Sequence, residues 1–194
     1  WCRQFPEKWR RLIFVLLMKK TPSDQVDKKR EVGIASQLLK LFEGVFCKPA
    51  YDEFEGRLHK AQYGNIRGSG CCEPAAGVQW QMDSAFMLRH PLYISFVDAV
   101  KFHPRCQHVP VEIMEAMIGL PEDIRNITKE LFSDMIGAYE SVEGLAEWAP
   151  FPTVFQGGVT SAPKCRLLMN ALAEAIALVD VGVRTWTGQL ADGR

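Results

Sequence analysis

The chain alternates between short apolar runs and longer amphipathic stretches. The run "LIFVLLM", Leu12 to Met18, is apolar throughout and is followed by two lysines, which is typical of a buried strand. A second run, "LYISFV" at Leu92 to Val97, is rich in residues that favour strands, and Asp98 follows it directly. The pattern therefore predicts two strands, the second of which ends in a carboxylate.

Helical periodicity accounts for most of the remaining chain. Helices are expected from about 34 onward, over about 75–88, on both sides of the Gly119 to Pro121 turn, and over about 164–179. The apolar positions expected to face inward are Ile34, Leu38, Leu41, Phe42 and Val45 in the first helix, Val78, Met82, Ala85 and Phe86 in the second, and Ile124, Ile127, Leu131 and Met135 after the turn.

Turn-forming residues separate these elements. The segments "KKTPSDQVDKKR" and "QYGNIRGSGCCEP" are polar or rich in glycine, residues 140–152 indicate a hairpin or loop, and "TVFQGGVTSAP" is a second glycine-rich turn. Strands and helices mix without a regular βαβ alternation, which favours the α+β class. With 194 residues, the chain is expected to form a single domain.

Composition narrows the class of protein. The formal net charge is zero, but residues 1–60 hold 13 Lys and Arg against 8 Asp and Glu, which permits one face for a polyanion. No apolar run approaches the roughly 18 residues of a membrane span, so no membrane partner is expected. The six cysteines include no CxxC pair and two are adjacent, so we interpret them as reduced thiols of an intracellular protein, nuclear or cytoplasmic.

Two candidate sites follow from the residues alone. Asp98 either caps the turn after its strand or serves as a ligand, because a buried carboxylate is costly unless it is paired or binds a metal. The compact group His103, Cys106 and His108 in "HPRCQH" contains zinc-ligand types, but a second ligand pair at a known spacing is missing.

Six segments occur in a characteristic order: "FPEKWRRLIFVLLMKK", "KKREVGIASQLLKLFEGVF", "AQYGNIRGSG", "LYISFVDAVKFHP", "GLPEDIRNITKELF" and "FQGGVTSAP". In that order they resemble the amino-terminal part of a reverse transcriptase of the non-LTR retrotransposon or group II intron type, and they span almost the whole chain. The resemblance implies the fingers and partial palm of a right-hand polymerase, helix-rich with a small antiparallel sheet. The fingers would occupy about 1–88 and the partial palm about 89–194.

The same resemblance implies roles for particular residues. Asp98 matches the first catalytic aspartate, which holds Mg²⁺ for two-metal nucleotidyl transfer. The remaining matches are nucleotide-binding positions. They are Lys19, Lys20 and Arg30 for the triphosphate, Phe102 and His103 for the aromatic residue that excludes a ribose 2′-hydroxyl, and Gln156 with Gly157 for the loop under the incoming nucleotide.

Several positions depart from the family pattern. Glu31 stands where proline is usual, Asn65 where an aromatic residue is usual, and Pro163 comes one residue late. The family's second catalytic element, an aromatic-x-Asp-Asp turn, is expected after the last helix and is not reached by Arg194. Since the chain starts at Trp1 without an initiator methionine, we expect it to be an excerpt of a longer reading frame.

The resulting functional expectation has two forms. In the first, the chain is part of an RNA-directed DNA polymerase that takes an RNA template, an RNA/DNA hybrid and deoxynucleoside triphosphates with Mg²⁺, and it is inactive by itself. In the second, it is a decayed polymerase domain that acts as an RNA-binding or scaffold protein. A helical interaction domain unrelated to either is the remaining alternative.

Overall fold

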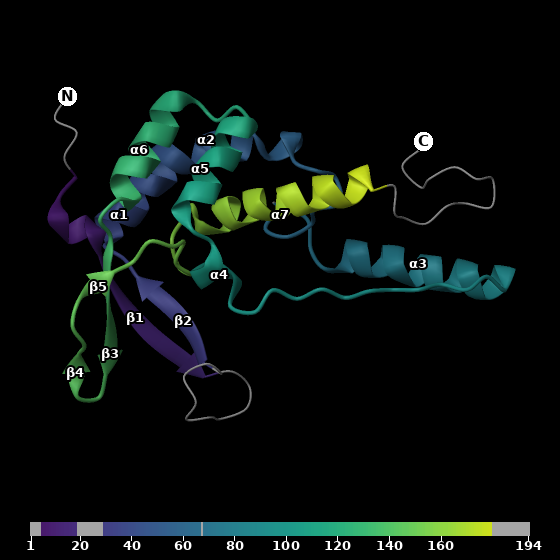
Figure 1. Ribbon diagram of the computed structural model, residues 1–194, viewed down its shortest axis with the longest axis horizontal. Helices are drawn as coiled ribbons and strands as arrows, with labels where there is room; N and C mark the ends of the chain where they lie inside the picture. Colours follow the sequence, from purple (N-terminus) through teal and green to yellow (C-terminus); the bar gives the residue numbers. More distant parts are fainter. Residues whose placement is uncertain (1–4, 19–28, 67, 180–194) are drawn as a thin grey trace. The chain divides into compact units, whose positions relative to one another are not determined.

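The computed structural model describes residues 5–18, 29–66 and 68–179. The chain divides into two compact units, of which the first consists of residues 1–57 and 101–168 and the second of residues 58–100 and 169–194 (Figure 1). Helices and a small sheet occur together, so the α+β class is confirmed at this level. The division into fingers and partial palm stays a prediction.

The sheet belongs to the first unit. Its strands follow the order β2-β1-β3-β4, and β5 pairs with β3. The apolar run predicted as a strand forms β1, which pairs antiparallel with β2 and parallel with β3. The sheet is therefore mixed, and the expectation of an antiparallel sheet was wrong in this respect. The strands are β1 (Arg11–Met18), β2 (Lys29–Ile34), β3 (Ile136–Ser141), β4 (Gly144–Leu145) and β5 (Ala149–Pro150).

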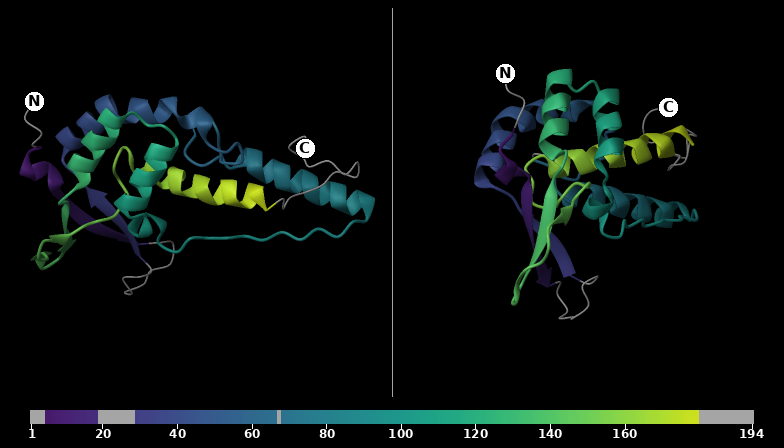
Figure 2. Two further views of the ribbon diagram at one scale, coloured as in Figure 1. Left: turned by 45° about the horizontal axis from the view of Figure 1, so that its top comes forward. Right: turned by 60° about the vertical axis from the view of Figure 1, so that its left-hand side comes forward.

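Helices of the first unit lie next to its sheet (Figure 2), and side chains from both form the core. The buried cluster contains Leu12 and Phe14 from β1 together with Leu39, Leu131 and Phe155. The expected helices around the Gly119 to Pro121 turn are confirmed as α5 and α6. Residues 140–152, expected to form a hairpin or loop, contain the end of β3 together with β4 and β5. The helical segments are η1 (Glu7–Arg10), α1 (Gln37–Phe42), η3 (Glu43–Cys47), α2 (Lys48–Glu53), η4 (Glu55–Arg57), α4 (Phe102–Arg105), α5 (His108–Met117), α6 (Glu122–Phe132) and the first turns of α7 (Ser161–Leu178).

The first predicted helix begins later and buries a different face than expected. Ile34 belongs to β2, and Leu38, Leu41 and Val45 are exposed. The buried positions of this helical stretch are Leu39, Glu43, Cys47 and Tyr51, which recur every four residues. An apolar-periodicity argument selects the wrong face here because one member of the buried row is a glutamate.

The second unit contains α3 (Cys72–Leu88), the end of α7 and the segment that joins α3 to α4. The side chain of Asn170 accepts hydrogen bonds from the His59 backbone N–H at 2.7 Å and from Gln62 Nε2 at 2.8 Å. Over its range α3 has no buried residue, and Phe86 is 85% exposed, so the inward face expected for this helix was wrong.

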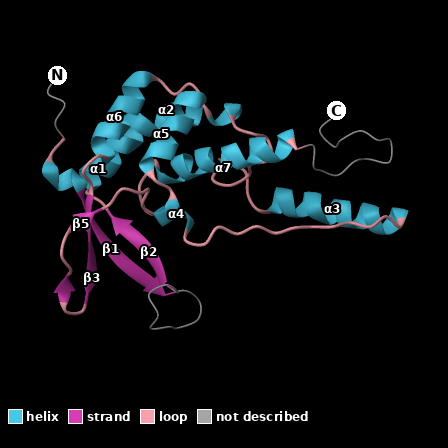
Figure 3. Ribbon diagram, viewed as in Figure 1, coloured by secondary structure: helices cyan, strands magenta, loops and turns pink. Residues whose placement is uncertain are grey.

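The strand expected at Leu92 to Val97 is absent from the described structure, in which residues 90–99 have no regular secondary structure (Figure 3). Tyr93, Phe96 and Val97 are each about nine-tenths exposed. A strand is stabilised by hydrogen bonds to a neighbour, and within the described residues no strand pairs with this segment. Side-chain preference alone therefore predicted the wrong state. Among the same described residues, no helix is long and apolar enough to cross a membrane.

Candidate functional site

The predicted nucleotide-binding residues are distributed over several elements. Arg30 lies on β2, where it is exposed and pairs in register with Leu17 of β1. Gln156 and Gly157 lie in the turn before α7, as expected from the glycine-rich sequence. Lys19 and Lys20 lie outside the described residues.

The turn with Gln156 contacts the strand with Arg30. The Gly33 backbone N–H donates to the Gln156 carbonyl oxygen at 2.8 Å. Gly157 has a φ of +121°, and a Cβ at this position would lie 2.5 Å from the Gly33 carbonyl oxygen. Only glycine allows the turn to approach the strand this closely in this backbone conformation. The fold thus brings together two segments that the family resemblance assigned to the nucleotide site.

Glu31 connects β2 to the segment that begins α4. Its carboxylate accepts hydrogen bonds from Lys101 Nζ at 3.0 Å and from the Tyr139 hydroxyl at 3.1 Å. Lys101 caps α4 in a left-handed conformation and directly precedes Phe102 and His103. Burial and the Glu31 carboxylate raise the pKa of Tyr139 to about 12. Glu31 therefore has a structural role in this chain.

Phe102 and His103 are half-buried at the start of α4. Phe102 packs against the buried cluster of Cys106, Val111 and Cys165. Burial lowers the pKa of His103, which favours the neutral form of its ring. The Phe102 ring meets the His103 ring edge-on, with centroids 6.3 Å apart. That either ring contacts a sugar stays a prediction.

Asp98 belongs to the second unit and is exposed in the irregular segment before α4. Gln156 and Arg30 belong to the first unit, so the predicted approach of Asp98 to them stays a prediction. In the part of the chain that the structure describes, no group of three or more His, Cys, Asp or Glu side chains is arranged to hold a metal ion. His103, Cys106 and His108, the zinc-ligand candidates from the sequence, therefore do not form such a group.

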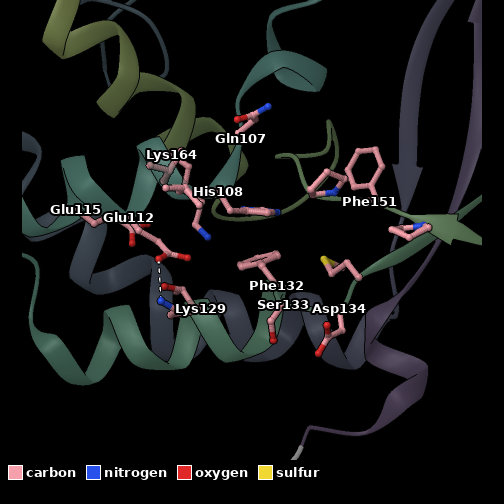
Figure 4. Close-up of a pocket in the computed structure, with 16 residues that line it drawn as sticks. Gln107, His108, Glu112, Glu115, Lys129, Phe132, Ser133, Asp134, Phe151 and Lys164 are labelled. Carbon is pink, nitrogen blue, oxygen red and sulfur yellow. Dashed lines mark ion pairs between the residues drawn. The ribbon is translucent and has the colours of Figure 1, made fainter.

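A pocket of about 460 Å³ lies in the first unit, between α5, α6, the β5 strand and the start of α7 (Figure 4). Its walls include Phe132, Phe151 and Met135. The Lys164 ammonium lies 3.7 Å from the centroid of the Phe132 ring, and the His108 ring stacks on Phe132 with centroids 5.4 Å apart.

Burial controls the ionisation of the polar groups in this pocket. It lowers the pKa of Lys164, against the opposing effects of Glu115 and Glu43. It also raises the pKa of Glu115 and lowers that of His108 to about 4, with Lys164 contributing to the shift of His108. The Tyr51 hydroxyl donates to Glu115 Oε1. The second Glu115 oxygen and His108 Nε2 are buried without a hydrogen-bond partner.

Glu43 positions the helix that contributes Lys164. Its carboxylate accepts a hydrogen bond from the Thr160 hydroxyl at 2.6 Å, and the Thr160 backbone N–H donates to the same oxygen at 3.3 Å. Thr160 directly precedes α7, so this carboxylate satisfies groups at the helix N-terminus and is favoured by the helix dipole.

An apolar pocket with a few convergent polar groups is the usual form of a small-molecule site. Sequence reasoning missed this pocket. The available signal was a charged residue within an apolar row, Glu115 four residues after Val111, both of which line the pocket.

No protein-family model matches this chain, and no curated protein matches it.

Proposed function

We propose that the chain forms part of an RNA-directed DNA polymerase of the reverse transcriptase type. The supporting observation is the hydrogen bond between Gly33 and Gln156, together with the close approach of Gly157 to the same strand. These contacts join the strand that carries Arg30 to the turn that would lie under an incoming nucleotide. Both segments come from the motif series that resembles the family.

In this proposal Arg30 binds the triphosphate, because a guanidinium can donate two parallel hydrogen bonds to phosphate oxygens. The exposed position of Arg30 leaves it accessible to a ligand. The turn at Gln156 and Gly157 supports the base and template, because its glycine lets the backbone approach closely.

Asp98 fits the requirement for one carboxylate ligand of Mg²⁺. It is exposed, and Mg²⁺ is commonly bound by one or two carboxylates together with substrate phosphate oxygens. When bound, Mg²⁺ would act as a Lewis acid on the transferred phosphoryl group. One carboxylate is insufficient for two metal ions, so the proposed chemistry requires further carboxylates.

The alternative, an RNA-binding or scaffold protein derived from such a polymerase, is favoured by Glu31. Its carboxylate is paired with Lys101 and accepts a hydrogen bond from Tyr139, so it connects β2 to two other elements. A scaffold keeps such a structural contact without nucleotide chemistry.

Binding experiments with fluorescence-labelled ligands test the proposal. The 194-residue chain is expected to bind RNA and an RNA/DNA hybrid with little sequence preference and with affinity that falls steeply as salt rises, because phosphate contacts release counterions. Arg30→Ala should weaken binding and reduce the salt slope by about one. Arg105→Ala is the matched control, since Arg105 is also exposed in the first unit but matches no motif.

Nucleotide binding separates the two candidates. For a polymerase, deoxynucleoside triphosphate with Mg²⁺ should bind, and both Arg30→Ala and Gln156→Ala should weaken it. For an RNA-binding protein, the hybrid should bind without measurable triphosphate affinity. Hybrid affinity that is flat between low and physiological salt, or no binding at all, would contradict both.

A further inference from the structure

Two cysteines from distant parts of the sequence are in contact in the first unit. The Sγ atoms of Cys106 and Cys165 lie 3.5 Å apart. Both residues are buried, with 1% and 5% of their surface exposed, and they belong to a small core cluster with Val111 and Val154. All five cysteines in the described residues, including these two, are free thiols.

Separate segments hold the two sulfur atoms. The Cys106 backbone N–H donates to the carbonyl groups of Phe102 and His103, and its carbonyl oxygen accepts from Val154 at 2.8 Å. Cys165 lies in the first turns of α7, whose start is held by the hydrogen bonds between Glu43 and Thr160. The backbone at both cysteines is therefore held by hydrogen bonds, and the contact between their sulfur atoms follows from the fold.

We propose that Cys106 and Cys165 form an oxidisable dithiol that reacts with a small peroxide and closes to an intramolecular disulfide. A disulfide needs the sulfur atoms at about 2.05 Å, so the pair must approach by about 1.5 Å from its present separation. Side-chain rotation with a small backbone shift can supply this movement. The inference does not depend on the proposed polymerase function.

The hydrogen bonds indicate which sulfur reacts first. The Cys165 thiol donates to Cys106 Sγ, and this bond lowers the pKa of Cys106 while raising that of Cys165. The Cys106 thiol donates in turn to the Phe102 carbonyl oxygen at 3.2 Å, an interaction that is lost on ionisation. Because the thiolate is the nucleophile, Cys106 is the attacking residue and Cys165 the resolving one.

The reaction has two balanced steps. In the first, the Cys106 thiolate attacks one peroxide oxygen, an S–O bond forms, the O–O bond breaks, and the departing hydroxide takes a proton to become water. In the second, the Cys165 sulfur attacks Cys106 Sγ and loses its proton. The S–S bond forms, the S–O bond breaks, and the hydroxide leaves with that proton as a second water. The two sulfurs lose two electrons, which reduce the peroxide.

Access is limited but not prevented. Hydrogen peroxide is close to water in size, and α4 is a helix of four residues that ends one residue before Cys106. Local opening of such a short element is expected to be frequent compared with global unfolding. Cys47 is a weaker competitor, because burial raises its pKa to about 11.

The closed disulfide would join the start of α7 to the end of α4. It would cross-link residues 59 positions apart, which restricts the unfolded chain considerably. If the polymerase proposal holds, this bond also connects the segment after Asp98 to the helix after the Gln156 turn. Oxidation would then restrain the nucleotide site, and this last consequence alone depends on the proposed function.

The test uses the 194-residue chain carrying Cys2→Ser, Cys71→Ser and Cys72→Ser, which leaves Cys47, Cys106 and Cys165. The reduced protein is treated with hydrogen peroxide, unreacted thiols are alkylated after unfolding, and disulfide peptides are mapped by mass spectrometry. The expected product is a monomer that has lost two hydrogen atoms, with a Cys106–Cys165 bond and alkylated Cys47. Its melting temperature should exceed that of the reduced form by roughly 5–15 °C.

Two single variants in that background test the order of reaction. With Cys165→Ser, Cys106 should accumulate as a sulfenic acid that dimedone traps. With Cys106→Ser, dimedone should not label Cys165. Circular dichroism of each variant shows whether it is folded, and the mapping of the unsubstituted pair decides the proposal even where a variant does not fold.

Treatment of the same protein in guanidinium chloride is the control for proximity. The unfolded chain should yield a mixture of pairings among the three cysteines, whereas the folded chain should yield one. Recovery of Cys106 and Cys165 as alkylated thiols from oxidised, folded protein would overturn the proposal. A bond from either residue to Cys47 or to a second chain in place of the expected one would do the same.

Discussion

The backbone N–H of Gly33 donates to the carbonyl oxygen of Gln156 at 2.8 Å, which holds the glycine-rich turn against an edge strand. The neighbouring Gly157 makes this contact possible, since a side chain there would meet the Gly33 carbonyl oxygen.

Gly157→Ala is therefore expected to destabilise the first unit by about 1–3 kcal/mol, because it adds a steric conflict at a positive φ. Urea denaturation measures the change. The control is Gly44→Ala, where an added Cβ meets nothing within 4 Å and the backbone is helical, so that stability should be unchanged or slightly higher. Equal stabilities of the two variants would show that the turn does not press on β2 as described.

Glu31→Gln should lower the pKa of Tyr139 below its value of about 12. Burial is the main cause of the raised value and would remain, but the repulsion between the phenolate and the carboxylate would be lost. The pKa is measured from the ultraviolet absorbance of ionised tyrosine, with Tyr139→Phe identifying the contribution of this residue. An unchanged titration would mean that Glu31 and Tyr139 are not in contact in solution.

Stability should fall in mild acid because of His108. Its folded pKa of about 4 lies below the ordinary 6.5, so the unfolded state binds the proton first as the pH drops through this window. His108→Phe should reduce the loss between pH 6.5 and 4 by roughly 2 kcal/mol, as measured by urea denaturation at a series of pH values.

Glu115 acts in the opposite direction, since its raised pKa makes the folded state take up a proton before the unfolded state does. Glu115→Gln should therefore make the acid loss steeper than in the natural chain. If the stability of both variants had the same pH dependence as that of the natural chain, His108 and Glu115 would not be buried in solution as they are in this structure.

The 194-residue chain should not extend a primer with either Mg²⁺ or Mn²⁺. Two divalent ions about 4 Å apart repel each other strongly, and a single aspartate cannot offset that repulsion. A longer protein that includes this chain and the further carboxylates should extend a primer, and Asp98→Asn in that protein should abolish extension. Extension by the 194-residue chain, or no effect of the substitution, would remove Asp98 from the proposed role.

Local sequence patterns predicted the helices that are marked by their own periodicity, α3, α5, α6 and α7. The strand β1 was recognisable as well, because its apolar run marks a position inside the core, although its partners β2 and β3 come from elsewhere in the chain. The strand β2 was missed because Lys29, Arg30 and Glu31 are polar, and an edge strand needs fewer apolar side chains than a central one.

Features that depend on distant residues could not be predicted in the same way. The segment after Leu92 has strand composition, yet a strand requires a neighbour that no local pattern supplies. The pocket depends on Lys164, whose charge is favoured by the carboxylates of Glu115 and Glu43 from other elements against the effect of burial. The turn at Gln156 was expected, but its hydrogen bond to Gly33 was not.

The exposed segment with Tyr93, Phe96 and Val97 has a consequence for the colloidal behaviour of the protein. Its apolar, β-prone side chains carry no charge between Leu92 and Val97, a composition that favours growth of stacked sheets between separate molecules. Concentrated solutions should therefore thicken or deposit fibrils over time. Because the segment is already exposed in the folded chain, the rate should depend on the protein concentration and not on the stability of either unit.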